Sequence, residues 1–154
     1  ADPAACWPAG VMALGGTVCT DRRQLPADEF FTGLFSTALE PDEVVLGVQF
    51  PCTQQAHYLK FEQPASRFAM TGVAVAQVGS VVRVAVTGLG SGIYRWAAAE
   101  QALQCRLAPE ALQNCVLDAG IAMGDIHASA AFRAHLAAVL TRRAVQHILK
   151  SSTV

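Results

Sequence analysis

Two long runs of small and β-branched apolar residues, separated only by Gly79 and Ser80, constrain the fold of this chain more than any other feature. The runs cover residues 69–78 and 81–89. A Gly-Ser pair between two such runs is typical of a β-hairpin. A third run at 57–63 alternates partly between apolar and polar residues. The sequence therefore predicts a three-stranded antiparallel sheet over these three segments.

Helical spacing follows the predicted sheet. Apolar residues recur every three or four positions in the segments 96–104, 109–121 and 129–150, which would give each helix one apolar face. The last segment shows this spacing most clearly, with apolar residues along one side and arginines on the others. We expect three helices here, and a frayed tail at 151–154 because chain ends make few contacts.

The first 52 residues indicate part of a larger unit. They predict four elements, which are a short helix at 2–14, a strand at 17–20, a helical turn at 26–31 and a strand at 43–50. Two short strands are too few for a closed sheet, so we expect a missing segment upstream. The predicted fold class is α+β. We expect two domains, at residues 1–52 and 56–150.

Composition limits what the chain can do. Of its 154 residues, 53% are hydrophobic and 15% are charged, which excludes a disordered chain. The formal net charge of −1 argues against a nucleic-acid or anionic-membrane surface, and no stretch approaches the roughly 20 apolar residues that span a bilayer. A mean hydropathy of +0.34 predicts apolar surface that something else covers. The start at Ala1, without an initiator Met, fits a position inside a longer protein.

Neither the cysteines nor the histidines form a metal-binding pattern. The five cysteines include no C-x-x-C pair, and the four histidines are scattered. We interpret the cysteines as reduced, small apolar core residues of a cytoplasmic protein, because no secretory signal is present. A cysteine-dependent enzyme is the weaker alternative. We expect no metal ligand and no catalytic residue in this chain.

Three local features leave a choice between structure and binding. The glycine series at 88–92 follows a strand but lacks the third glycine of a dinucleotide loop, so a turn is favoured over a phosphate site. Asp2 can cap a helix, or the helix end can offer N–H groups to an anion or a sugar hydroxyl chain. Lys60 lies mid-strand, where an ammonium points either to solvent or to a ligand.

Short segments carry a further signal through their order along nearly the whole chain. They are 1–5, 26–31, 38–44, 58–61, 65–69, 72–76, 125–129, 132–133 and 135–136. This ordered series resembles the FAD-binding medium subunit of the molybdenum hydroxylases, the family of the carbon monoxide dehydrogenase medium subunit and the xanthine dehydrogenase flavin domain. No single motif is diagnostic.

The resemblance implies an architecture and partners. Residues 1–52 would be the C-terminal part of the second FAD-binding subdomain. Residues 56–150 would be the family's C-terminal domain, a three-stranded antiparallel sheet packed on a helical bundle. The N-terminal subdomain, whose glycine-rich loops hold the pyrophosphate, would be missing. The implied partners are that subdomain and the molybdenum-binding and iron–sulfur subunits of the complex.

The resemblance also implies which residues face the cofactor. Asp2 falls in the turn that faces FAD, and Val45 matches a backbone contact to the flavin. Lys60 matches a lysine at the flavin, and Phe68 occupies the aromatic position beside the isoalloxazine ring. Cys6 departs from the family, which often has an aspartate there, and a thiol is a weaker hydrogen-bond partner. The redox chemistry belongs to FAD rather than to these residues.

We expect a fragment of a flavoprotein subunit that positions FAD for electron transfer from iron–sulfur clusters to the terminal acceptor. We expect the chain alone to retain no FAD, because half a pocket forfeits much of the contact that affinity requires. The alternative is a stand-alone, non-catalytic interaction or ligand-binding module. It would form homo-oligomers through the face left by the missing subdomain.

Overall fold

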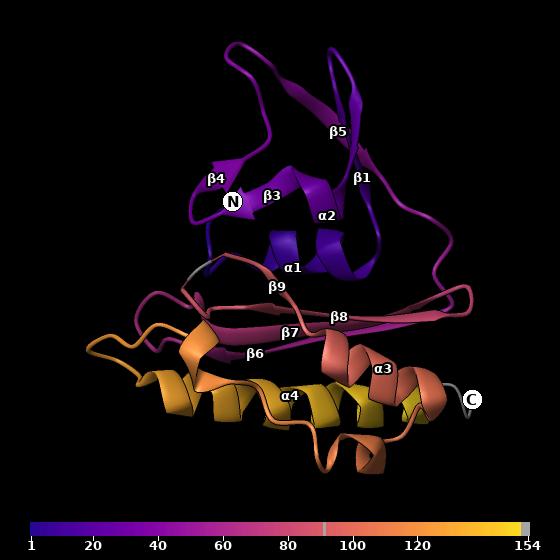
Figure 1. Ribbon diagram of the computed structural model, residues 1–154, viewed down its shortest axis with the longest axis vertical. Helices are drawn as coiled ribbons and strands as arrows, with labels where there is room; N and C mark the ends of the chain where they lie inside the picture. The colour runs from indigo at the N-terminus through magenta and orange to yellow at the C-terminus, as the bar shows by residue number, and fades with distance from the viewer. Residues whose placement is uncertain (91, 152–154) are drawn as a thin grey trace.

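The structure, a computed structural model, describes residues 1–90 and 92–151. Figure 1 shows two parts along the longest axis, with the first fifty residues in indigo and violet above a sheet that has helices on its other side. We name residues 1–50 the N-terminal part and residues 55–151 the C-terminal part. The predicted α+β class is confirmed. Within the described ranges, no helix has both the length and the apolar character needed to span a membrane.

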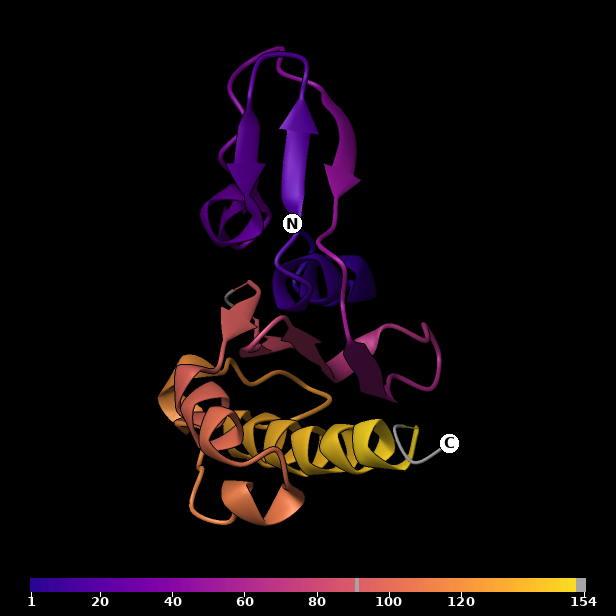
Figure 2. The same cartoon turned by 90° about the vertical axis from the view of Figure 1, so that its right-hand side faces the viewer.

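The N-terminal part holds two short helices and two small antiparallel sheets (Figure 2). Its elements are α1 (Cys6–Ala13), β1 (Thr17–Thr20), β2 (Gln24–Pro26), α2 (Ala27–Phe30), β3 (Phe31–Gly33), β4 (Ser36–Thr37) and β5 (Val45–Gln49). Strand β1 lies between β2 and β5, and β3 pairs with β4. The strand predicted at 17–20 is confirmed, and the strand predicted at 43–50 is shorter.

Helix α1 begins later than the sequence predicts, and Asp2 does not cap it. The Asp2 Oδ1 accepts a hydrogen bond from the Ala4 N–H at 2.8 Å, and the Ala5 N–H donates to the Asp2 carbonyl at 3.2 Å. Such local bonds compete with helical ones for the same backbone groups. Helical geometry therefore starts only at Cys6, after an Ala5 that supplies no side-chain cap.

The C-terminal part contains a four-stranded antiparallel sheet. Its elements are β6 (Gln55–Glu62), β7 (Ala69–Val78), β8 (Val81–Thr87), β9 (Tyr94–Arg95), α3 (Ala97–Cys105), the 3₁₀ helices η1 (Pro109–Leu112) and η2 (Ala119–Ile121), and α4 (Ala130–Ser151). The strand order is β6-β7-β8-β9, and the predicted hairpin pairs Val78 with Val81. The prediction of three strands omitted β9, because two residues are too few to show alternation.

The predicted helices are confirmed at both ends of the series and wrong in the middle. Helices α3 and α4 lie within one residue of the predicted bounds, and the Ser129 Oγ caps α4 by accepting the Phe132 N–H at 3.2 Å. The helix predicted at 109–121 is wrong, since the segment forms only η1 and η2. The Asp118 Oδ1 accepts the Gly120 N–H at 2.9 Å, a local bond that competes with a continuous helix.

The predicted tail at 151–154 is corrected at its first residue and otherwise untested. Ser151 is the last residue of α4, and its Oγ donates to the Ile148 carbonyl at 2.9 Å. This bond keeps the final helical turn together. Residues 152–154 lie outside the described residues.

Strand β7 is buried on both faces, and its alternation separates two cores. Val73 and Val75 pack with β8, α3 and α4 into the larger apolar cluster. Ala74 and Ala76 face α1 and join a smaller cluster around Met12. Figure 2 shows α1 and α4 on opposite sides of the sheet. A strand buried on both faces has no polar side, which is why the sequence shows a near-continuous apolar run there.

Ion pairs tie the N-terminal part to the sheet. Arg83 of β8 donates to Asp28 of α2 at 2.8 Å and to the Met12 carbonyl at 3.0 Å. Arg95 of β9 donates to the same carboxylate at 2.8 Å and to Glu100 of α3 at 2.7 Å. Burial by itself would raise the pKa of Asp28, but the hydrogen bonds from the two arginines outweigh burial and lower it. Asp28 therefore stays charged and joins three elements.

The prediction that the cysteines fill the core is wrong in that none of them is fully buried, although Cys115 packs against the larger cluster. All five are free thiols; Cys52 and Cys105 are exposed, and Cys6, Cys19 and Cys115 are partly exposed. Valine and alanine fill both clusters, with leucine, Trp96 and Ile148 in the larger one and Met12 and Phe30 in the smaller one. Most of these residues pack closely without a polar atom, so the core needs no thiol.

Candidate functional site

Two of the predicted site residues, Lys60 and Phe68, line one shallow, open pocket. Its volume is about 360 Å³. The walls come from the start of α1, the middle of β6 and the turn between β6 and β7. The packing of α1 on the sheet therefore gathers residues that are distant in the sequence. The lining is Ala5, Cys6, Trp7, Lys60, Ser66, Arg67 and Phe68.

Lys60 is held at the pocket by neighbouring groups. Its Nζ donates to the Arg67 carbonyl at 2.8 Å and lies 3.3 Å from Glu62 Oε1. Hydrogen bonds from Lys60 and Arg67 lower the pKa of Glu62, so the carboxylate balances the ammonium charge. The Lys60 side chain is 25% exposed. An ammonium has three N–H donors, and these contacts leave one for a ligand.

The turn between β6 and β7 presents Phe68 at the edge of this pocket. The Arg67 N–H donates to the Gln63 carbonyl at 2.9 Å, and the Gln63 N–H donates to the Phe68 carbonyl at 2.9 Å. Arg67 adopts a φ of 62°, which is uncommon for a residue with a side chain. The turn is thus held at both ends. Phe68 is half exposed, so an aromatic surface faces outward.

Trp7 is a residue that sequence reasoning missed. It is 78% exposed, and it also lines a second pocket of about 220 Å³. The lining of that pocket is Cys6, Trp7, Gly10, Val11, Leu14, Phe50 and Tyr58. Since Cys6 and Trp7 line both pockets, the first turn of α1 lies between them. The available signal was the position of Trp7 directly after Cys6, where the sequence departs from the family it resembles.

Tyr58 was also missed, although it lies two residues from Lys60 and therefore shares its face of β6. The Tyr58 hydroxyl is buried and has no hydrogen-bond partner within the part of the chain that is described. Burial, with the Cys6 thiol beside it, raises the pKa of Tyr58. The hydroxyl lies over Gly72, where a Cβ would collide with it. The two-residue spacing from Lys60 is the signal that could have identified Tyr58.

The other two predicted residues lie apart from the Lys60 pocket. Asp2 is bonded to the Ala4 N–H, and the next residues, Pro3 and Ala4, line a different pocket of about 280 Å³. Val45 begins β5 and is 40% exposed, but it lines neither pocket beside α1. The structure therefore brings together two of the four predicted residues. The roles of Asp2 and Val45 stay predictions.

The glycine-rich segment after β8 leaves the sheet as a turn, and its Ser91 lies outside the described residues. Gly88 has a φ of 83°, and a Cβ there would collide with the Met70 carbonyl. Its N–H donates to the Pro3 carbonyl at 2.6 Å. The next helix, α3, starts only at Ala97. The glycine therefore permits close backbone packing, and no helix N-terminus is adjacent to hold a phosphate.

A buried arginine anchors the same turn. Arg133 donates to the Gly88 carbonyl at 2.7 Å and to Asp125 at 2.6 Å. Backbone N–H groups of Ala128 and His127, helped by Arg133, hold the pKa of Asp125 at about 2. The segment 125–133 thus fixes the loop before α4 against the sheet exit.

The Lys60 pocket combines a fixed cation, exposed aromatic side chains and an open side. Such a surface can bind a flat ligand that carries or gains negative charge. Within residues 1–90 and 92–151, no group of three or more His, Cys, Asp or Glu could hold a metal ion.

Comparison with known proteins gives relatives for nearly the whole chain, although no family model matches it. The chain is 32% identical over 159 residues to the nicotine 6-hydroxylase medium subunit of Paenarthrobacter nicotinovorans, covering 94% of this chain and 56% of that protein. It is 31% identical over 166 residues to caffeine dehydrogenase subunit beta of a Pseudomonas strain, covering 94% and 55%. The chain thus spans about half the length of the curated relatives it matches.

A solved structure shares the arrangement. Carbon monoxide dehydrogenase from Hydrogenophaga pseudoflava, in a form lacking the Mo-pyranopterin moiety of the molybdenum cofactor, matches with a TM-score of 0.82 and 26% sequence identity. The match covers 97% of this chain and 57% of that one. The N-terminal part, the sheet and its helices are therefore an arrangement that this protein has in common with that dehydrogenase.

Proposed function

We propose that this chain, a homologue of the flavoprotein medium subunits of molybdenum hydroxylases, forms one wall of an FAD site and positions the cofactor for electron transfer. FAD, when bound, supplies the redox chemistry between iron–sulfur clusters and a terminal acceptor. The observation that carries the proposal is the pocket where the partly exposed Lys60 ammonium lies with exposed Phe68 and Trp7.

Lys60 provides the charge in this proposal. Its ammonium is fixed by the Arg67 carbonyl and Glu62, so it cannot swing far into solvent. A fixed positive charge attracts negative charge that develops on a bound ligand, and the attraction grows when water is excluded. The remaining N–H group of Lys60 would donate a hydrogen bond to one ligand atom and so fix the direction of this attraction.

Apolar contacts would come from the exposed rings. Phe68 supports stacking against a flat ring, and Trp7 adds a second aromatic side chain to the lining of the pocket. Asp2, in the turn before α1, and Val45, at the start of β5, are proposed as contacts to more distant parts of FAD. Both are partly exposed, as such contacts require.

The pocket is open, and we propose that another part of the family's subunit completes it. An open pocket buries too little of a large cofactor to hold it, so the chain alone would be colourless and inactive. In the complete cytoplasmic complex, the partners would be the rest of the flavin subunit and the molybdenum-binding and iron–sulfur subunits.

FAD content tests this proposal. The chain alone and a chimera, in which this chain follows the remaining part of the nicotine 6-hydroxylase medium subunit, are purified and their visible absorbance is measured. We expect one FAD per chimera and none in the chain alone. A folded chimera without flavin contradicts the proposal, and a stoichiometric flavin in the chain alone contradicts the incomplete pocket.

A matched pair of lysine variants tests the role of Lys60. In the chimera, Lys60→Gln should lower the flavin midpoint potential by roughly 30 mV, because the reduced, more negative form loses a neighbouring cation. Lys150→Gln, at the exposed end of α4, is the control and should leave the potential unchanged. Equal potentials in wild type and Lys60→Gln would remove Lys60 from the site.

The alternative function, a self-associating module, rests on exposed apolar side chains of the N-terminal part. Trp7 is 78%, Phe35 is 72% and Leu46 is 71% exposed. Sedimentation equilibrium distinguishes the two functions. A dimer that dissociates on dilution, and that the Trp7→Ser variant does not form, favours self-association. A monomer at all concentrations contradicts it.

A further inference from the structure

A groove beside α4 lies apart from the pockets around α1. It is formed by α4 and the link between η1 and η2, and its volume is about 440 Å³, within the range of small-molecule sites. Figure 1 shows this link, in orange, running beside α4 on the side of the molecule away from α1. The lining is Gln113, Cys115, Val116, Leu117, Asp118, Ala119, Ala131, Ala134, His135, Ala138 and Arg142.

Small side chains open this groove. Ala131, Ala138 and Arg142 are spaced by seven and four residues, so they share one side of α4. The alanines leave a space between the helix backbone and the link that larger side chains would fill. On the link, Leu117 is buried and Val116 is 82% exposed, which gives the groove an apolar wall and rim.

Arg142 places an uncompensated positive charge in the groove. It is partly buried, and within the described part of the chain it has no hydrogen bond or ion pair. Helix α4 contains no Asp or Glu. Asp118 is the acidic residue of the lining, and its Oδ1 accepts the Gly120 N–H at 2.9 Å. His135 lines the same groove and adds a nitrogen donor.

We propose that this groove binds a small organic carboxylate. The carboxylate pairs with the Arg142 guanidinium, whose planar N–H groups match two carboxylate oxygens. The apolar body of the ligand lies on Ala131 and Ala138 and against Val116. A partly buried guanidinium without a counter-ion gains more from such an anion than a fully solvated one does. The site is separate from the proposed FAD site and does not depend on it.

A titration of the chain with benzoate tests the proposal, followed by the NMR signals of backbone amides. We expect saturable chemical-shift changes at the amides of Ala138 and Arg142, with a dissociation constant of about 1 mM. One ion pair and a small apolar contact give an affinity of this order. Benzamide, which has a similar shape but no charge, should bind at least roughly tenfold more weakly. Equal binding of the two compounds, or no saturable shift with benzoate, overturns the proposal.

Matched variants locate the site. Arg142→Gln should weaken benzoate binding roughly tenfold, whereas Arg143→Gln, an exposed neighbour outside the lining, should change it by less than about twofold. Ala131→Leu adds bulk to the lining at an exposed helix position and should also weaken binding roughly tenfold, with Arg142 intact. If both arginine variants weaken benzoate binding equally, net charge alone explains the weakening, and the assignment of the site to Arg142 is overturned.

Discussion

The two faces of β7 meet different partners. On one face, Val73 and Val75 join a large apolar cluster that α3 and α4 close completely. On the other, Ala74 and Ala76 contact α1, and beyond it the N-terminal part has a small cluster, several ion pairs and exposed aromatic residues. The C-terminal part is therefore held mainly by its large buried core, whereas the N-terminal part has a smaller core and depends more on ion pairs. Both parts carry exposed apolar side chains.

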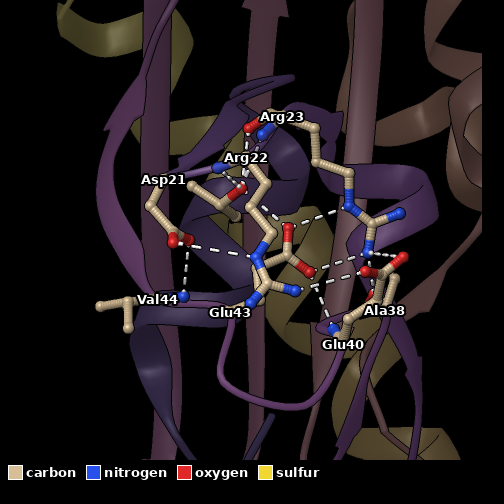
Figure 3. Close-up of polar contacts among 8 residues, drawn as sticks. Asp21, Arg22, Arg23, Ala38, Glu40, Glu43 and Val44 are labelled. Atoms are coloured by element: carbon tan, nitrogen blue, oxygen red, sulfur yellow. Dashed lines mark hydrogen bonds and ion pairs between the residues drawn. The ribbon is translucent and has the colours of Figure 1, made fainter.

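Charge holds the end of the N-terminal part that is most distant from the sheet. Figure 3 shows Arg23 donating to both carboxylate oxygens of Glu43, at 2.9 and 2.8 Å. The Thr20 hydroxyl and the Glu40 N–H each donate to the same carboxylate at 2.8 Å. With Arg23 first among these donors, they hold the pKa of Glu43 at about 2. The turns around β1 and β5 thus depend on one buried carboxylate.

The largest expected effect is in the C-terminal core. Leu103 of α3 is 1% exposed, so Leu103→Ala should lower the free energy of unfolding by about 3 kcal/mol, through lost burial and a cavity. Urea unfolding followed by circular dichroism measures it. Leu149→Ala, at a 37% exposed position, should cost less than about 1 kcal/mol. Similar costs for both variants would contradict a closed core on this face.

The next largest effect is a loss of stability in acid that is expected in the N-terminal part before the C-terminal part. The folded state lowers the pKa of Glu43 from 4.5 to about 2, so its stabilisation is complete above pH 4.5 and is lost as pH falls toward 2. Glu43→Gln should therefore destabilise the protein at pH 7 and converge with wild type in acid. Hydrogen exchange should show amides of β1 opening before those of β7. The control, Glu29→Gln, removes an exposed charge.

Two outcomes would contradict this separation of the two parts by pH. If β7 amides open together with β1 amides as the pH falls, the two parts unfold as one unit. If Glu43→Gln keeps the pH dependence of wild type, the buried carboxylate is not its source.

A smaller effect is expected where β6 meets α4. The rings of His57 and His147 stack with centroids 4.5 Å apart and planes within 7°. Burial, and then the neighbouring His147, lower the pKa of His57. The unfolded state thus takes up a proton more readily, so stability falls as pH drops below about 6.5. His147→Gln should reduce this slope in urea unfolding, and His127→Gln, in an exposed loop, should keep it.

The sequence predicts the elements whose signal is local. The Gly79-Ser80 hairpin and α4 follow from periodicities within one segment, and both are confirmed. The segment 109–121 shows helical spacing too, but local bonds such as that of Asp118 break it into two turns. Pattern alone does not weigh such bonds against helix formation.

The candidate site is harder to predict, because it depends on packing between distant segments. Phe68 came from a family resemblance, and Lys60 came from that resemblance and from its position in the middle of a predicted strand. No spacing in the sequence places the two residues in one pocket. Trp7 and Tyr58 acquire their positions only when α1 packs on the sheet. Lys60 within β6 indicated which face of that strand could meet a ligand, but the sequence could not show which helix would lie beside this face.

The smallest expected change in stability belongs to Trp7. Because its side chain is 78% exposed, Trp7→Ser should alter the free energy of unfolding of the chain by less than about 0.5 kcal/mol. In the chimera, the same change should reduce FAD content, because the ring would be covered there. Val116→Ser, an 82% exposed position in the C-terminal part, is the matched control and should leave FAD content unchanged. A loss of more than about 1 kcal/mol in the chain alone would make Trp7 part of the core. The smaller core of the N-terminal part would then extend to the first turn of α1, and its contrast with the larger core of the C-terminal part would shrink.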